Sequence, residues 1–499
     1  AGKRRGLGRG AVSGRENAFA MTYFFETYGC QMNHAESASV AELLDSRGWA
    51  ASPDADTADL VIINTCSVRI TAETRALSRI SLFCSQKKRR DVRVLVMGCM
   101  AERLRNDLKK RFKKLDFVVG MFERDSFADI FRSIEEGSAY ARASNVATMT
   151  DAAAATDAAA ATDAAAATDT ATATDERPVN AYHFAPSSWV KGSFQTFVPI
   201  MNGCNNFCTY CIVPYVRGRE VSRPMPEILD EFDALADRGV REVTLLGQNV
   251  NSYAWLDPAT GETVDFPALL ERIARRVERK DRIRWVRFMS SHPKDLSDRL
   301  IEVIARERVF CRFLHLPVQH GSDRVLDAMN RRYTRAQYLA LVDRVRAGIP
   351  DVTLSTDILM GFPGETEEDV EETLELIRRV RYEVAFMYHY NPREGTKAFS
   401  IPNRIPEEIK KERLDRVIKL QHAVSAELMR ERVGKTVTVL VESTSRNRAD
   451  ELFGHTELGE MVVFSGTLDK ALIGHFVEAE LTCLRGRTFR AKMIGDSSS

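Results

Sequence analysis

The sequence lacks a long apolar run and carries almost no net charge. No uncharged apolar stretch approaches the roughly 20 residues that span a bilayer, which argues against a membrane protein. The formal net charge is +1, a small value for a protein that binds nucleic acid. Affinity for RNA would have to come from local basic groups, such as those in residues 87–93, 103–114 and 272–287, and each of these is equally explained as a solvated helix face.

Residues 1–20 also lack the continuous apolar core of a secretory signal. They hold five basic residues and one acidic residue. This composition fits an organellar transit peptide, but the missing amphipathic pattern favours a disordered basic tail. Nine cysteines in 499 residues without an export signal indicate a reducing compartment, where thiols are metal ligands or catalysts more often than disulfides. A cytoplasmic location is expected.

Composition and periodicity divide the rest of the chain into four segments. Residues 21–142 alternate strand-like and helical runs, as in a small parallel α/β domain. Residues 190–430 repeat this alternation for long enough to form a partial, six-stranded (β/α) barrel. Residues 431–499 hold short alternating strands, typical of a small antiparallel β-barrel. Between the first two domains, residues 143–185 contain a Thr-Asp-Ala repeat that cannot build a packed core, so we expect a dispensable linker.

Three strand-like runs of the first domain each end within a few residues of a cysteine. The runs are 23–27, 60–64 and 92–97, and the cysteines are Cys30, Cys66 and Cys99. Loops at the carboxyl ends of parallel strands lie along one edge of a sheet. We therefore expect these three thiols, here called the N-terminal trio, to meet.

The sharpest pattern is the loop CNNFCTYC, with Cys204, Cys208 and Cys211, here called the barrel trio. Three thiolates from one loop can hold three irons of a 4Fe-4S cube and leave the fourth iron open. A zinc or electron-transfer site completed by a distant cysteine is the alternative. The loop follows the first of six expected barrel strands, which are 197–201, 242–246, 285–289, 312–317, 353–359 and 384–390.

The cysteine loop and the barrel pattern together resemble the radical S-adenosylmethionine (SAM) superfamily, in which SAM binds the open iron and yields a 5′-deoxyadenosyl radical. The segments TYGCQMN (27–33), NTCSVR (64–69) and MGC (97–99) resemble the auxiliary-cluster domain of methylthiotransferases. The C-terminal barrel is similar to their RNA-binding TRAM module. The resemblance implies two [4Fe-4S] clusters, one on each trio. It also implies one SAM as the radical source and a second as the methyl donor.

Four stretches resemble the MiaB-type branch, whose members convert N(6)-isopentenyladenosine next to the tRNA anticodon to its 2-methylthio derivative. They are LGQNVN (246–251), SSHP (290–293), LHLPVQHGSD (314–323) and STD (355–357). Residues 388–393 (YHYNPR) depart from the more usual Tyr-Ser-Pro-Arg. One alternative is a sister methylthiotransferase acting on threonylcarbamoyl-adenosine or on a ribosomal protein. The other is a non-enzymatic iron-sulfur protein that binds RNA or senses redox state.

The resemblance also implies contacts with SAM and RNA. The expected SAM contacts are Tyr210, Gln248, Asn249, Ser291, Gln319 and Asp357, although a structural role explains Tyr210 equally well. The expected RNA contacts are Arg485, Arg487, Arg490 and Lys492, because the rest of the last domain balances its charges. Arg217, Arg219 and Arg223 either reach RNA phosphate or the SAM carboxylate, or pair with neighbouring acids. The expected partners are tRNA, a flavodoxin- or ferredoxin-like electron donor and a sulfur source. The protein itself is expected to be a monomer.

Other reactive side chains have a simpler explanation. Cys84, Cys311 and Cys483 have no partner at ligand spacing, so we expect small buried hydrophobes. His292 and His315 lie near the ends of expected barrel strands, where a hydrogen-bonded structural role is at least as well supported as a functional one. Residues 361–366 lack the lysine of a P-loop and predict a tight turn into a helix, with an acidic residue close to SAM.

Overall fold

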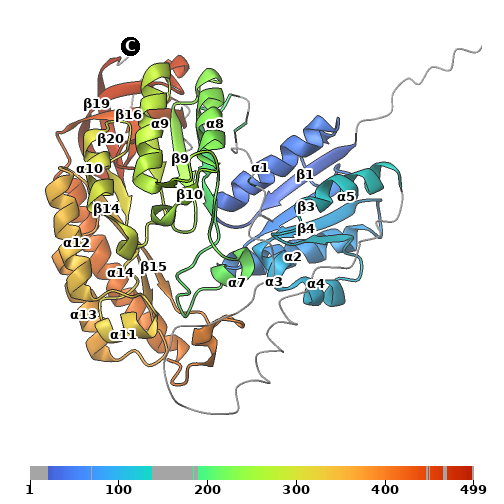
Figure 1. Cartoon of the computed structure of the whole chain (residues 1–499), viewed down its shortest axis with the longest axis horizontal. Helices are drawn as coiled ribbons and strands as arrows, with labels where there is room; N and C mark the ends of the chain where they lie inside the picture. Colours follow the sequence, from blue (N-terminus) through green and yellow to red (C-terminus); the bar gives the residue numbers. More distant parts are fainter. Residues whose placement is uncertain are drawn as a thin grey trace, which may run out of the picture.

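The computed structural model describes residues 21–68, 70–137, 184, 189–190, 192–445, 448, 450–464 and 469–496. The expected basic tail and nearly all of the expected linker lie outside these residues. The described residues form an N-terminal α/β domain, a half-barrel and a small closed barrel (Figure 1). The fold class expected from the sequence is confirmed.

The N-terminal domain is a five-stranded parallel sheet in the order β2-β1-β3-β4-β5. Alternate residues of β3 belong to two separate apolar cores, because helices cover both faces of the sheet. Its strands are β1 (Thr22–Thr27), β2 (Ala50–Ala51), β3 (Leu60–Thr65), β4 (Arg93–Gly98) and β5 (Phe117–Val119). Its helices are α1 (Gln31–Ser46), α2 (Ile70–Gln86), α3 (Cys99–Arg103), α4 (Arg105–Arg111) and α5 (Ser126–Glu135). The three predicted strands are correct to within one residue, and the two short edge strands were not predicted.

Six parallel strands form the half-barrel, as two three-stranded sheets in the orders β12-β9-β6 and β13-β14-β15. A parallel bridge between Val286 and Phe310 lies at the junction of the two sheets. The strands are β6 (Gln195–Pro199), β9 (Glu242–Leu246), β12 (Trp285–Phe288), β13 (Phe313–His315), β14 (Thr353–Met360) and β15 (Val384–His389). Alternate residues of a strand face opposite sides. Leu354 and Ile358 enter the core beneath the helices, so Asp357 between them faces the lumen.

Helices cover the outside of the half-barrel (Figure 1). Two of these helices begin at a clear sequence signal. Thr334 and Thr366 form capping boxes at the N-termini of α12 and α13, which satisfy backbone N–H groups that have no partner within the helix. The helices are α7 (Val213–Arg217), α8 (Met225–Asp237), α9 (Phe266–Lys280), α10 (Asp298–Arg306), α11 (Asp323–Ala328), α12 (Arg335–Gly348), α13 (Glu367–Val380) and α14 (Glu407–Arg430). Short strand pairs are β7 (Met201–Asn202) with β8 (Val221–Ser222), and β10 (Ala254–Leu256) with β11 (Thr263–Asp265).

The C-terminal barrel closes in the order β16-β17-β18-β20-β19. Its strands are β16 (Thr436–Thr444), β17 (Leu452–Thr456), β18 (Met461–Phe464), β19 (Phe476–Arg485) and β20 (Thr488–Asp496). All neighbours are antiparallel except β18 and β20, and β17 was not predicted.

A buried contact docks the C-terminal barrel on the half-barrel. Trp285 and Cys311 of the half-barrel pack against Leu440 and Phe476. Trp285 begins β12, so this barrel sits at the amino ends of the half-barrel strands. In the described part of the chain, no helix is long and apolar enough to cross a membrane.

Candidate active site

The N-terminal trio lies at the carboxyl edge of the first sheet. Cys30 is the N-cap of α1 after β1, Cys66 follows β3, and Cys99 begins α3 directly after β4. Burial, together with nearby Glu36, Cys66 and Cys30, raises the pKa of the Cys99 thiol to about 12. The three residues are therefore electrostatic neighbours, as the topology predicted.

Two buried asparagines hold this edge together. Asn33 donates from Nδ2 to Asn64 Oδ1 at 3.0 Å and to the Thr65 carbonyl at 3.1 Å, and its Oδ1 accepts the Cys30 N–H at 3.1 Å. Asn64 returns a hydrogen bond to the Asn33 carbonyl at 2.7 Å. The pair ties the start of α1 to the end of β3. Sequence reasoning missed it, although a polar residue in the apolar run LVIINT was a usable signal.

The barrel trio lies in the loop between β7 and α7. Burial, together with nearby Cys208, raises the pKa of Cys204 to about 11 and the pKa of Cys211 to about 12. Thiols in such surroundings stay protonated unless a metal centre supplies positive charge, because coordination deprotonates a thiol outright. Both trios therefore suit metal binding better than free thiolate chemistry.

Single-ion sites and iron-sulfur cubes place different demands on three thiols. Among the described residues, no three His, Cys, Asp or Glu side chains converge on one ion position. A zinc site needs such convergence. An iron-sulfur cube does not, because each thiolate binds a different iron.

A buried arginine stands beside the barrel trio. Arg331 Nη1 lies 3.4 Å from Cys208 Sγ, and the other nitrogens donate to Tyr333 Oη at 3.0 Å and to the Pro317 carbonyl at 2.6 Å. A fixed cation here stabilises an anionic sulfur. Sequence reasoning missed Arg331, because it lies far along the chain from the cysteine loop and has no local signal.

Unpartnered polar atoms cluster after β9 and β12. Asn251 Oδ1 and Nδ2, Ser291 Oγ and His292 Nε2 are buried and have no hydrogen-bond partner among the described residues. Such atoms are costly unless something fills the site. Burial, with Arg331 adding to it, lowers the pKa of His292 to about 2, so the ring is neutral. Its Nδ1 accepts the Lys294 N–H at 3.3 Å, which leaves the proton on the unpartnered Nε2.

Of the six expected SAM contacts, two already serve as braces. Gln248 Oε1 accepts the Gly203 N–H at 2.7 Å and so supports the cysteine loop. Asn249 uses Oδ1 for the His292 N–H at 2.9 Å and Nδ2 for Asp295 at 2.7 Å. Tyr210 packs beside Phe362 and Tyr390 in a small apolar cluster. Ser291 Oγ, in contrast, is buried and has no hydrogen-bond partner among the described residues.

Gln319 and Asp357 lie at the lumen of the half-barrel. Gln319 has a φ of 75° and exchanges backbone hydrogen bonds with β14. The Asp357 carboxylate lies 3.5 Å from His315 Nε2, and His315 Nδ1 lies 2.9 Å from Ser355 Oγ. The Phe386 ring packs edge-on to His315 and is 40% exposed. This wall combines an exposed aromatic face with a polar pair, and the sequence did not single out its phenylalanine.

The structure places the charged residues for which the sequence left alternatives open. Arg217 and Arg223 are buried in ion pairs, with Glu36 at 2.9 Å and with Glu231 respectively, so the paired explanation holds and neither is exposed to RNA phosphate. Arg219 lies over the Phe207 ring. The acidic residue of the 361–366 loop, Glu365, is fully buried.

Glu365 braces the turn rather than projecting from it. It accepts the Gly361 N–H at 2.7 Å and binds Arg413 at 3.0 Å. Its carboxylate also lies 3.1 Å from His320 Nε2. The predicted tight turn into a helix is present, since α13 begins directly after Thr366.

The expected RNA contacts lie on the hairpin of β19 and β20. Arg485, Arg487 and Lys492 are exposed, whereas Arg490 binds Glu451 at 2.7 Å. Cys483 on the same hairpin is exposed, so the expectation that it is buried was wrong, while Cys84 and Cys311 are buried as expected. Because this barrel docks at the amino ends of the half-barrel strands, the structure does not bring these basic residues to the cysteine edge.

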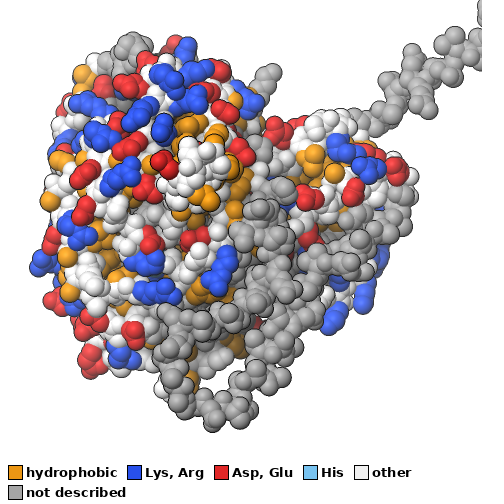
Figure 2. All heavy atoms as spheres, in the orientation of Figure 1, with side chains coloured by type: hydrophobic (Ala, Val, Ile, Leu, Met, Phe, Trp, Pro, Cys, Tyr) orange, Lys and Arg blue, Asp and Glu red, His pale blue; other side chains and the backbone are white. Residues whose placement is uncertain are grey.

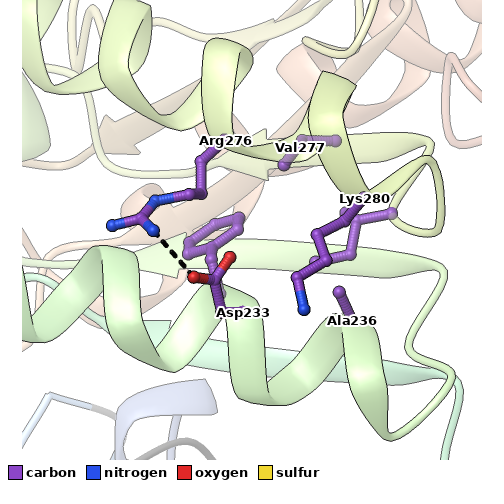
Figure 3. Close-up of a pocket in the computed structure, with 7 residues that line it drawn as sticks. Asp233, Ala236, Arg276, Val277 and Lys280 are labelled. Carbon is purple, nitrogen blue, oxygen red and sulfur yellow. Dashed lines mark hydrogen bonds and ion pairs between the residues drawn. The ribbon is translucent and has the colours of Figure 1, made fainter.

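Two further features lie on the outside of the half-barrel. On the face in Figure 2, basic and acidic side chains are interspersed over the half-barrel helices. A pocket between α8 and α9 is lined by apolar residues and by Asp233 and Arg276, which form an ion pair at 2.8 Å (Figure 3). Lys280 also lines the pocket, and Asp233 Oδ1 is buried there without a hydrogen-bond partner among the described residues. The helices α8 and α9 carry neither cysteine trio.

Comparisons with known proteins agree with this architecture. Three family models match: an uncharacterized protein family, UPF0004, over residues 22–120, the radical SAM superfamily over 198–377 and the TRAM domain over 430–494. A tRNA-2-methylthio-N(6)-dimethylallyladenosine synthase of Treponema denticola is 56% identical over 95% of this chain and 100% of its own. A protein of the same name from Phocaeicola vulgatus is 42% identical over 94% and 95%. The solved radical SAM methyltransferase TsrM of Kitasatospora setae shares the fold, with 16% identity and a TM-score of 0.51 over 76% of this chain and 74% of its own.

Proposed function

The chain belongs to the family of tRNA-2-methylthio-N(6)-dimethylallyladenosine synthases, and we propose that it adds a methylthio group to N(6)-isopentenyladenosine next to the anticodon of tRNA. The family assignment rests on relatives up to 56% identical over nearly the whole chain. It confirms the resemblance noted in the sequence. The observation that carries the proposed reaction is the presence of two cysteine trios, each with at least one buried thiol, at the meeting edges of two domains.

We propose that each trio holds one [4Fe-4S] cluster, the barrel trio together with SAM. When bound, these cofactors would pass on the electron, form the radical and deliver the sulfur and methyl group that are needed to replace the hydrogen of an unactivated aromatic C–H bond. The chain's own part is to bind and orient. Arg331 balances the charge of the barrel trio from 3.4 Å, and the unpartnered atoms of Asn251, Ser291 and His292 are the free hydrogen-bonding groups for SAM.

We propose that the adenine base enters the lumen beside Phe386. An exposed aromatic ring offers a stacking surface for a flipped-out base. The Asp357 carboxylate, partly exposed and 3.5 Å from His315, can accept a hydrogen bond from the base edge. We also propose that a flavodoxin- or ferredoxin-like protein donates the electron and that a separate source supplies the sulfur. Because the substrate is tRNA, we propose a cytoplasmic setting.

Anaerobic reconstitution tests the proposal. The wild-type protein should bind about eight irons and eight sulfides per chain, and each trio replaced by alanine should remove about half. With SAM, reductant and an isopentenylated anticodon stem-loop, mass spectrometry should detect the 2-methylthio nucleoside and 5′-deoxyadenosine. The variant lacking Cys30, Cys66 and Cys99 should still form 5′-deoxyadenosine and no methylthio product.

The same assay separates the alternatives. Product on a threonylcarbamoyl-adenosine stem-loop, with none on the isopentenylated one, would assign the protein to a sister methylthiotransferase. A complete absence of 5′-deoxyadenosine from the cluster-loaded protein would leave a non-enzymatic iron-sulfur protein.

A further inference from the structure

We infer that Arg217 and Arg393, which reach from the half-barrel into the N-terminal domain, are positioning residues that set the placement of the two cysteine trios relative to each other. The inference rests on the proposed function, because it assumes that both trios carry clusters. It gives Arg217 and Arg393 a role that the sequence patterns did not indicate for either residue.

Arg217 forms the first contact. It ends α7, the helix that follows the barrel trio, and its Nη1 lies 2.9 Å from Glu36 Oε1 in α1, the helix capped by Cys30. The same nitrogen donates to Asn202 Oδ1 at 3.0 Å. The two charged side chains are 3% and 2% exposed. A buried pair of this kind tolerates no separation, because either charge left alone would be strongly unfavourable.

Arg393 forms the second contact. It follows β15, and its Nη2 donates to the Val68 carbonyl at 2.5 Å, two residues beyond Cys66. Its Nη1 lies 3.6 Å from Glu73 in α2. The Arg393 side chain is 11% exposed, whereas Val68, whose carbonyl accepts its hydrogen bond, lies at the surface.

Glu73 extends the second contact to the rest of the N-terminal trio. It accepts hydrogen bonds from Arg103 Nη2 at 2.7 and 2.8 Å. Arg103 ends α3, the helix that Cys99 begins, and its Nε donates to Ser67 Oγ at 3.3 Å. Arg393 is thus linked to the elements that carry Cys66 and Cys99, while Arg217 is linked to the one that carries Cys30.

The two domains also meet directly at the trios. Cys99 and Met121 of the N-terminal domain share one buried cluster with Ile212 and Val216 of the half-barrel. Arg393 is close enough to interact electrostatically with Cys66 of one trio and Cys211 of the other. Its guanidinium is therefore near a cysteine of each proposed metal site. Figure 1 shows α7 beside α2 and α3 at this junction.

The expected consequence is coupling between two half-reactions. Domains of one chain move relative to each other by default, and a displacement of 1 Å can cost about 100-fold in rate. SAM cleavage needs only the barrel trio and its surroundings. Transfer of sulfur to the substrate needs both sites at the correct separation. Loss of Arg393 should therefore uncouple the second step from the first.

The test uses full-length, reconstituted Arg393→Gln, with Arg299→Gln as a control. Arg299 is an exposed arginine that pairs with Asp265 at 3.2 Å, far from either trio. We expect R393Q to keep about eight irons and to form 5′-deoxyadenosine within about threefold of wild type. Its ratio of methylthio product to 5′-deoxyadenosine should fall at least about tenfold, and Arg393→Lys should recover part of it. R299Q should match wild type.

Electron paramagnetic resonance supplies a readout that does not depend on turnover. Magnetic interaction between the two reduced clusters depends on their separation, so R393Q should change it and R299Q should not. If R393Q does not fold, Glu73→Gln removes the partner and should shift the ratio in the same direction.

Three outcomes would overturn the inference. Equal loss of 5′-deoxyadenosine and product would mean that Arg393 acts on SAM. An unchanged ratio would mean that Arg393 has no positioning role, and an unchanged magnetic interaction would mean that the separation is set elsewhere. A wild-type protein that holds only about four irons would instead contradict the proposed function itself.

Discussion

Replacing Gly98 with alanine should remove the N-terminal cluster and leave the barrel cluster in place. Gly98 joins β4 to Cys99 and has φ 95° and ψ −165°, a conformation that costs other residues about 1–3 kcal/mol. An added Cβ would lie 2.4 Å from Asn64 Oδ1 and 2.5 Å from the Thr65 carbonyl oxygen. The carbonyl cannot move away without moving Cys66, so overpacking adds about 1–3 kcal/mol.

The total of about 2–6 kcal/mol is smaller than or comparable to the 5–15 kcal/mol that stabilises a typical domain. G98A should therefore fold, with its trio displaced. Gly48→Ala is the control, because Gly48 has a φ of 85° and nothing within 4 Å of an added Cβ. After reconstitution G98A should hold about four irons, form 5′-deoxyadenosine and make no methylthio product, whereas G48A should keep about eight irons. Full iron in G98A, or equal loss in G48A, would refute the packing argument.

Three further predictions concern RNA, the base and the domain junction. Arg485→Ala with Arg487→Ala should weaken binding of the stem-loop and lower the salt dependence of log K by about two, measured by anisotropy from low to moderate salt; an unchanged slope would place RNA elsewhere. Phe386→Ala should raise the KM for the stem-loop by about 5- to 100-fold, the value of one stacked base, while an unchanged KM would contradict stacking. Burial disfavours the charged form of His455, but its hydrogen bonds to two glutamates outweigh this effect and raise the pKa of His455 above 6.5. The protonated His455 therefore contributes fully to stability below pH 6.5, and this contribution is lost as the pH rises through the folded-state pKa. Melting temperatures from pH 6 to 9 should show this loss in wild type and not in His455→Gln, and equal slopes would contradict it.

The His455 prediction depends on a buried junction. His455 of the C-terminal barrel lies 2.7 Å from Glu242 Oε2 at the start of β9 and also binds Glu442. Arg287 binds Glu242 as well, and it donates to the Thr456 carbonyl at 2.9 Å. Charges buried together in this way must all be satisfied at once, which explains how the small barrel is held at one orientation.

The sequence by itself determined how the six candidate cysteines group into two trios and where most of the strands lie. Cys204, Cys208 and Cys211 share one short loop, so their spacing alone indicates a shared metal site. The N-terminal trio needed one extra step, the rule that carboxyl ends of parallel strands share an edge. Apolar runs such as 60–64 are local signals, whereas β2 and β5 were missed because these edge strands are only two and three residues long.

Tertiary structure alone decided which other residues serve the site. The Arg393 hydrogen bond to Val68 joins residues 325 apart in the chain, and Arg217 and Glu36 are 181 apart. Local patterns carry no record of such pairs, because the residues become neighbours only after whole domains have packed. The exposure of Cys483 and the docking of the C-terminal barrel at the amino ends of the half-barrel strands have the same origin. Burial and long-range ion pairing are properties of the assembled domains, while ligand spacing and strand periodicity are properties of the chain.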